Sequence, residues 1–225
     1  MATGAPPETV TGSTAVFDFD GTLTRRDTLI PFLRHALGPG RLRSVVARWM
    51  IGNAARPTGD RHRLKEALLA VAFAGMDRQE LTLHGRSFAQ WLVDTGGFRD
   101  DAMARLEWHR RQGHRLIIVS ASVDAYLQPV AAALGVELSC TRLAYDGEGR
   151  FTGTLAGSNC RGPIKVDRLH EMGVDRRWLW AYGNSGGDDA MLAFAAHGIR
   201  VGRSPIPGSP AWTGNPALGS VAAIP

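Results

Sequence analysis

Hydrophobic and polar positions along the chain follow two different periods. Short apolar runs such as TAVFDF (14–19) and RLIIVSAS (115–122) have the length and the β-branched or aromatic content of buried strands, and each ends at turn signals. The segment 136–155 predicts a strand and then a hairpin that turns at DGEG. Strands are therefore expected at 14–19, at 115–122, within 136–155, at 178–183 and at 198–202.

Between the first two strands, apolar residues instead recur three and four positions apart, which is the spacing of one helical face. Each such stretch starts near a Gly, Pro or Asp signal. Four helices are expected there, over 27–37, 41–52, 60–75 and 77–95. Further helices are expected over 99–112, 123–135 and 163–173, and after the glycine-rich loop at 183–189.

The order of these elements predicts an α/β fold, with an open, doubly wound parallel sheet that carries helices on both faces. Its core would comprise residues 14–26 and 99–203, with an all-helical insertion at 27–98. Residues 1–13 resemble a flexible leader. Residues 204–225 are rich in Pro, Gly and small side chains without any period, which predicts a mostly disordered tail.

Three predicted strands end in polar loops, at 18–22, 120–122 and 183–189. Ligands of open parallel sheets bind at the carboxyl ends of the strands, so an active site is expected where these loops meet. Asp18 and Asp20 would face the same way on a strand and repel each other unless a cation lies between them. Mg²⁺ suits such a site, although a pair of solvated turn aspartates is an open alternative.

Other residues at these loops add to the expected chemistry. The Ser120 hydroxyl can bind a phosphate oxygen, and Lys165, at a helix start, can hold an aspartate and a phosphate together. The 183–189 loop offers oxygen ligands. Each feature taken alone also fits an ordinary turn or a solvated residue.

In this order, the motifs DFDGT (18–22), VSAS (119–122), Lys165 and GNSGGDD (183–189) resemble those of the haloacid dehalogenase (HAD) superfamily of phosphatases. The resemblance covers about residues 14–202. The helical insertion looks like the cap of subfamily IB, which contains phosphoserine phosphatase and the phosphatidylglycerophosphatase C type. It implies a Rossmann-like fold with a C1-type cap.

The resemblance also implies residue roles. Asp18 would be the nucleophile that forms an aspartyl-phosphate, and Asp20 the acid and base, with Lys165 completing the catalytic set. Substrate binding would involve Thr22, Ser120, Ser122 and Asp27, although Asp27 can equally N-cap the first helix of the insertion. Metal binding would involve Asp18, Asp20, Asn184 and Asp188.

One position departs from the family pattern. Most members place an aspartate metal ligand directly after the glycine of the fourth motif, where this chain has Asn184. An amide carbonyl can bind Mg²⁺ but carries no charge, so weaker metal binding is expected. Asp188 aligns with the second acidic position, and Asp189 is an additional acid nearby.

The net charge of +5 is unevenly distributed. Residues 25–65 hold ten Lys and Arg against two acids, which suggests an anionic partner: a phosphate substrate, a lipid surface or nucleic acid. Arginines alternate with bulky apolar residues in RLRSVVARWMIG (41–52), as in segments that lie on anionic membranes. A solvated helical face is the alternative interpretation of the same charges.

We expect a cytoplasmic protein, because the chain has two cysteines, lacks an apolar run of ~18 residues and lacks a signal-peptide pattern. Peripheral contact with a membrane through the basic segment is left open. The expected function is Mg²⁺-dependent hydrolysis of a phosphomonoester, either a small metabolite or a phospholipid phosphate, with no nucleic-acid partner. The alternative is a non-catalytic protein of the same fold that binds nucleic acid or an anionic lipid surface.

Overall fold

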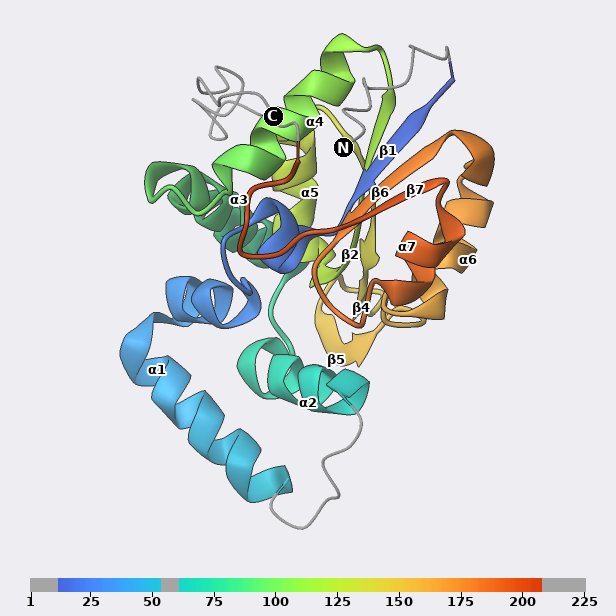
Figure 1. Ribbon diagram of the computed structural model, residues 1–225. Helices are drawn as coiled ribbons and strands as arrows, with labels where there is room; N and C mark the ends of the chain where they lie inside the picture. Colours follow the sequence, from blue (N-terminus) through green and yellow to red (C-terminus); the bar gives the residue numbers. More distant parts are fainter. Residues whose placement is uncertain (1–11, 54–60, 208–225) are drawn as a thin grey trace.

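The computed structural model describes residues 12–53 and 61–207 (Figure 1). Five strands form one parallel sheet in the order β3-β2-β1-β6-β7. The strands are β1 (Thr14–Phe17), β2 (Arg115–Val123), β3 (Glu137–Thr141), β6 (Leu179–Gly183) and β7 (His197–Arg200). A separate antiparallel hairpin consists of β4 (Leu143–Tyr145) and β5 (Phe151–Leu155).

Helices cover both faces of the sheet. They are α4 (Asp100–Arg111) and α5 (Asp124–Leu134) on one side, and α6 (Pro163–Glu171) and α7 (Asp189–Phe194) on the other (Figure 1). In β1, Ala15 and Phe17 pack into the core shared with α4 and α5, whereas Val16 packs into the core shared with α6 and α7. Burial on both faces explains why the strand is apolar without alternation. The predicted doubly wound α/β fold is confirmed.

The insertion contains α1 (Leu29–Asn53), α2 (Arg61–Phe73) and α3 (Arg78–Asp94). The first two predicted helices both lie in α1, which has non-helical backbone angles at Gly38 (φ 72°, ψ 164°), just before Pro39. The predicted boundary between them is therefore a break inside one continuous element. The start of the predicted third helix, at residue 60, lies outside the described residues.

The three insertion helices pack on different parts of the molecule. Helices α1 and α2 contact each other and project away from the sheet, with α2 against the β4–β5 hairpin (Figure 1). Helix α3 packs on α5 and also contacts α1. At their crossing Gly85 is required, because a Cβ there would lie 1.8 Å from the carbonyl oxygen of Ala125.

The first residues of the predicted tail, 204–207, lie in the described part of the chain. Ile206 is buried, and its N–H donates a hydrogen bond of 2.9 Å to Asp101, so the chain is packed on α4 at this point. Residues 208–225 lie outside the described part of the chain, as do residues 1–11 of the predicted leader.

A buried polar network connects His109 of α4 with Tyr182 of β6 and with His114. His109 shares hydrogen bonds with the Tyr182 hydroxyl (2.8 Å) and with His114 (2.7 Å). Burial, followed by the charges of His114 and Arg105, lowers the pKa of His109 to about 3. The imidazole of His109 is therefore neutral at physiological pH.

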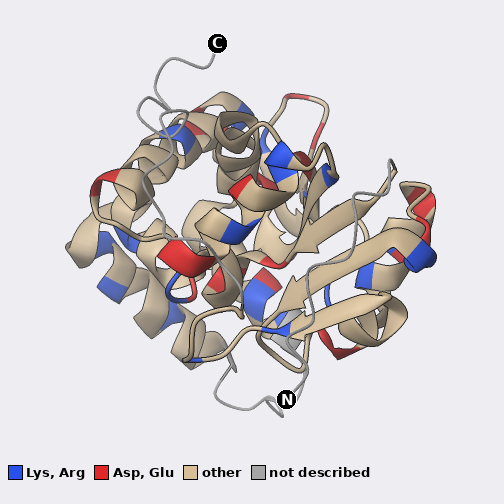
Figure 2. Cartoon of the chain, turned by 45° about the horizontal axis from the view of Figure 1, so that its top comes forward, with Lys and Arg blue, Asp and Glu red and all other residues tan. Residues whose placement is uncertain are grey.

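Charged residues lie mainly on helices and loops, while the strands are almost free of them (Figure 2). Helix α1 contains four arginines and no acidic residue. No helix in the described ranges is long and apolar enough to cross a membrane.

Candidate active site

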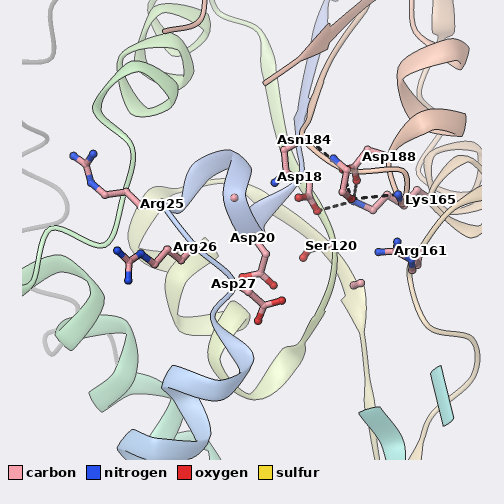
Figure 3. Close-up of a pocket in the computed structure, with 14 residues that line it drawn as sticks. Asp18, Asp20, Arg25, Arg26, Asp27, Ser120, Arg161, Lys165, Asn184 and Asp188 are labelled. Atoms are coloured by element: carbon pink, nitrogen blue, oxygen red, sulfur yellow. Dashed lines mark hydrogen bonds and ion pairs between the residues drawn. The ribbon is translucent and has the colours of Figure 1, made fainter. Parts of the chain in front are cut away.

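The three polar loops meet in one pocket at the carboxyl ends of β1, β2 and β6, which are neighbours in the sheet (Figure 3). The pocket has a volume of about 340 Å³. Asp18, Ser120 and Asn184 line it, each from a different loop. The convergence predicted from the strand ends is therefore present in the structure.

Asp18 belongs to a buried ion triad. The Lys165 ammonium lies 2.7 Å from Asp18 Oδ1 and 2.6 Å from Asp188 Oδ1. Burial raises the pKa of Asp18, although the Lys165 charge acts in the opposite direction. Burial alone would lower the pKa of Lys165, but the two carboxylates raise it. The ammonium is thus held charged between the two aspartates.

Both oxygens of Asp18 are oriented by protein donors. The Thr22 hydroxyl donates to Oδ2 at 3.2 Å, while Lys165 holds Oδ1. The backbone N–H of Asp18 donates to the Tyr182 carbonyl of β6 at 2.9 Å, which fixes the residue just beyond the end of β1. The carboxylate therefore has one defined orientation on the pocket wall.

Asp18 and Asp20 both line the pocket, but the expectation that they lie on one strand is wrong. The strand ends at Phe17, and residues 19–23 form a wide helical turn in which Gly21 has a positive φ of 72°. One Asp20 oxygen accepts hydrogen bonds from the Thr28 N–H (2.8 Å) and hydroxyl (2.5 Å), and the other accepts from Ser122.

The environment of Asp20 raises its pKa toward neutral pH. Burial, reinforced by the Asp27 charge, raises the pKa of Asp20 to about 6, while the Ser122 and Thr28 hydrogen bonds oppose the shift. The Thr28 hydroxyl also hydrogen-bonds with Tyr126 of α5 at 3.1 Å. The carboxyl can consequently exchange a proton near neutral pH.

The four residues expected to bind substrate divide into two pairs. Ser120 and Asp27 line the pocket. Thr22 and Ser122 are buried, and their hydroxyls donate to Asp18 and Asp20. In the structure the second pair orients the two carboxylates.

Asp27 was expected either to N-cap the first helix of the insertion or to bind substrate. It makes the N-cap hydrogen bond and also lines the pocket. Its Oδ1 accepts the Leu29 N–H at 3.0 Å, as an N-cap of α1 does. The same side chain also lines the pocket, beside Asp20 in Figure 3.

Asp188 organises the 183–189 loop. Its Oδ2 accepts hydrogen bonds from the Asn184 N–H (3.1 Å) and from the Ser185 N–H (2.9 Å) and hydroxyl (3.0 Å). Lys165 lowers the pKa of Asp188 despite its burial. Asp189, in contrast, is exposed and pairs with Arg200. Asp189 therefore does not join the cluster.

The Asn184 amide lies directly over the turn that carries Asp20. A Cβ at Gly21 would lie 2.1 Å from Asn184 Nδ2, so only glycine allows this approach. The side chain is exposed to the pocket and lies close to the backbone between Asp20 and Gly21.

The donor set at this point fits Mg²⁺. Two carboxylates, Asp18 and Asp188, hold the single ammonium of Lys165, so this buried triad has one negative charge in excess. Within the described ranges, no three His, Cys, Asp or Glu side chains are grouped to hold a metal. An ion here would need amide or backbone oxygens and water beside one or two carboxylates, which is the coordination that Mg²⁺ tolerates.

Sequence patterns did not identify four residues of the site. Thr28 and Tyr126 hold Asp20, and Arg161 lines the pocket. Lys65 of α2 donates to the Ala121 carbonyl, next to Ser120, and burial lowers the pKa of Lys65 to about 8. In the sequence, Lys65 is recognisable only as a member of the basic segment 25–65. That position predicts its charge but not which residue its ammonium contacts.

Comparison with known proteins assigns a family. Residues 15–193 match the model of the haloacid dehalogenase-like hydrolases. Protein CicA of Caulobacter vibrioides is 37% identical over 198 residues, which cover 83% of this chain and 85% of CicA.

Solved structures have the same fold. A protein of unknown function from Bordetella pertussis Tohama I superposes with a TM-score of 0.66 at 24% identity, over 82% of this chain and 87% of its own. A phosphoserine phosphatase, solved as a phospho-aspartyl intermediate analogue, gives a TM-score of 0.55 at 18% identity, over 84% and 85%. At these identities the similarity shows the fold alone.

Proposed function

Because the chain belongs to the haloacid dehalogenase-like hydrolase family, we propose that it is a Mg²⁺-dependent phosphomonoester hydrolase that acts through an aspartyl-phosphate on Asp18. Its substrate is a small phosphorylated metabolite or a phospholipid phosphate. The observation that carries the proposal is the placement of Asp18, fixed by Lys165 and Thr22 on the wall of a pocket that Asp20, with a pKa of about 6, also lines.

The proposal extends to the subfamily and to the domain division. The all-helical insertion between β1 and β2 and the fold shared with phosphoserine phosphatase support subfamily IB, the group of phosphoserine phosphatase and phosphatidylglycerophosphatase C. Residues 27–98 would then be the cap that selects the substrate.

In the first step, an Asp18 oxygen attacks phosphorus and the bond from phosphorus to the alcohol oxygen breaks. Asp20 donates its proton to that oxygen, so the product leaves as a neutral alcohol. Lys165 and Ser120 lie at the pocket wall beside Asp18, where their N–H and O–H groups can bind the phosphoryl oxygens as charge develops.

In the second step, water attacks the phosphorus of the aspartyl-phosphate. Asp20, now ionised, accepts a proton from this water, and the bond between phosphorus and the Asp18 oxygen breaks. Inorganic phosphate leaves, and both aspartates return to their starting states. Thr28 and Ser122 orient Asp20 in its ionised form.

The groups that would hold Mg²⁺ are the Asp18 carboxylate, the Asp20 backbone carbonyl and the Asn184 amide oxygen. Asp188 would hold Lys165 and the loop, because its Oδ1 accepts from Lys165 and its Oδ2 accepts three hydrogen bonds from Asn184 and Ser185. When bound, Mg²⁺ supplies positive charge that offsets the carboxylates and the phosphoryl oxygens.

Turnover of p-nitrophenyl phosphate with Mg²⁺ tests the proposal. We expect activity in the native chain and its loss in Asp18→Asn, which keeps the size of the side chain. A folded chain that turns over nothing in a broad panel of phosphomonoesters would instead support a non-catalytic binder of anions.

Asn184→Asp tests the metal assignment separately. It adds a carboxylate beside the Gly21 turn, so the Mg²⁺ concentration for half-maximal activity should fall by roughly tenfold, the effect of ~1.4 kcal/mol. Ser185→Asp places the same charge one residue further along the loop and is the control. An unchanged Mg²⁺ requirement in Asn184→Asp would argue against Asn184 as a ligand.

We also propose that the second half of α1 contacts an anionic lipid surface. Met50 and Ile51 are 59% and 77% exposed, and Arg41, Arg43 and Arg48 lie on the same helix without any acid. Flotation with phosphatidylglycerol vesicles at low salt is expected, and Ile51→Glu should weaken it. Flotation that is equal on neutral vesicles, or absent on both, would contradict this.

A further inference from the structure

Arg161 is a cation of the pocket that has no side-chain partner among the described residues. Arg161 lines the pocket from the loop that precedes α6, four residues before Lys165. Its guanidinium makes no hydrogen bond or ion pair with any residue that the structure describes. A half-buried arginine usually finds a carboxylate or carbonyl, so this one is available to a ligand.

The backbone beneath Arg161 fixes its position. A Cβ at Gly187 would lie 2.5 Å from Arg161 Nη1, so the guanidinium rests directly on this glycine. The Gly162 N–H donates to the Gly187 carbonyl at 2.8 Å and ties the two loops together. Figure 3 shows the guanidinium on the Lys165 side of the pocket, directed toward Ser120.

The other cations of the pocket are engaged or turned away. Lys165 is held by two aspartates, and Arg25 donates to Asp100 (3.0 Å) and to the Gly96 carbonyl (3.0 Å). Arg26 extends away from Ser120 in Figure 3. Arg161 is therefore the cation placed to meet a group that enters beside the phosphoryl position.

The pocket has room for such a group. Its volume of about 340 Å³ equals roughly eleven water molecules at ~30 Å³ each. A phosphoryl group beside Asp18 would fill a minor part of this space. The remainder, toward Arg161, can take the substituent of a leaving alcohol.

We propose that Arg161 binds a second anionic group on the leaving alcohol, so that the preferred substrates are phosphomonoesters that carry a carboxylate or a second phosphate. Both anions match the planar guanidinium in a bidentate contact. The inference rests on the proposed function and specifies the substrate class of the same pocket.

Two pairs of substrates that differ only in the second charge provide the test. 3-Phosphoglycerate is compared with glycerol 3-phosphate, and propane-1,3-diyl bisphosphate with 3-hydroxypropyl phosphate. In the native chain kcat/KM should favour the doubly anionic member of at least one pair by roughly tenfold, since a hydrogen bond to a charged group contributes at least ~1.5 kcal/mol. The pair that discriminates identifies the anion.

The readout in variants is the ratio of kcat/KM within each pair. Arg161→Gln should bring the ratio close to one, and Arg161→Lys should restore part of it. Arg25→Gln removes the same charge from the same pocket, where the guanidinium is already engaged, and should keep the native ratio.

Four results would overturn the assignment. Three of them are equal kcat/KM within both pairs in the native chain, a preference that survives Arg161→Gln, and an equal loss of preference in Arg25→Gln. A uniform loss across all substrates in Arg161→Gln would place Arg161 on the phosphoryl group and also overturn it. Absence of turnover with every phosphomonoester would contradict the proposed function itself, which separates the two failures.

Discussion

The triad of Asp18, Lys165 and Asp188 gives the sharpest prediction about stability. Lys165→Met preserves the length of the side chain and removes its charge. The Lys165 and Asp188 side chains are each 2% exposed and that of Asp18 is 9% exposed, so the two carboxylates would lose their partner without gaining water. Breaking a buried ion pair in this way costs about 3–5 kcal/mol in the free energy of unfolding.

The deficit should depend on pH and on Mg²⁺. Without Lys165 the two aspartates have raised pKa values, so the folded variant binds more protons than the unfolded chain as the pH falls. The loss of stability should therefore be largest at neutral pH and shrink in mild acid. Saturating Mg²⁺ should restore part of it, because the ion binds the folded state preferentially.

Urea denaturation at pH 7 and pH 5, with and without Mg²⁺, measures these effects. A deficit of about 4 kcal/mol corresponds to a midpoint shift of about 2 M at an m-value near 2 kcal/mol/M. Arg168→Met on the same helix is the control, because its pair with Glu171 is partly exposed to solvent and should cost less than ~1 kcal/mol. A Lys165→Met midpoint within 0.5 M of the native one, roughly 1 kcal/mol on this scale, would refute the reasoning.

Three further predictions concern single side chains. Ser122→Ala removes a hydrogen bond that lowers the pKa of Asp20, so the fall of kcat/KM as pH rises through about 6 should move to higher pH; an unmoved profile would mean that this limb does not report Asp20. The pKa of His109, about 3, lies below its unfolded value, so stability should be lost as pH falls from 6.5, by up to ~1.4 kcal/mol per unit. His109→Gln should flatten this slope in thermal unfolding at pH 4–7, and an unchanged slope would assign it to other groups. Gly85→Ala should cost ~1–3 kcal/mol by collision with α5, whereas Gly52→Ala, in open space on α1, should be neutral or stabilising; equal midpoints would contradict the close approach.

The sequence predicted the sheet and the loops that meet at its edge because both follow from local patterns. Apolar runs such as 14–17 fix the strands, and polar residues directly after them fix the loop positions. The break at Gly38 was likewise predicted, from the gap between two helical periods.

The internal geometry of the site was beyond the local pattern. The strand ends at Phe17, so Asp20 lies in the turn that follows it. Thr28, which donates to Asp20, is in turn bound by Tyr126, 98 residues further along the chain. Contacts of that kind depend on how α1 and α5 pack together. The direction of Lys65 is equally set by tertiary packing, since its charge alone allows any partner.

The close approach at Gly85 bears on how this protein could be recombined with its relatives. Helix α3 is contiguous in sequence with α1 and α2, yet it is interlocked with α5 where a single methyl group would not fit. A chimera that exchanges the whole of residues 27–98 would separate two helices that have to be matched to each other. The first half of α1 is also packed on these two helices, through Phe32 against Phe88 and Tyr126. We expect substitution of the second half of α1 together with α2, with junctions near residues 39 and 76, to give folded hybrids more often than exchange of the complete insertion.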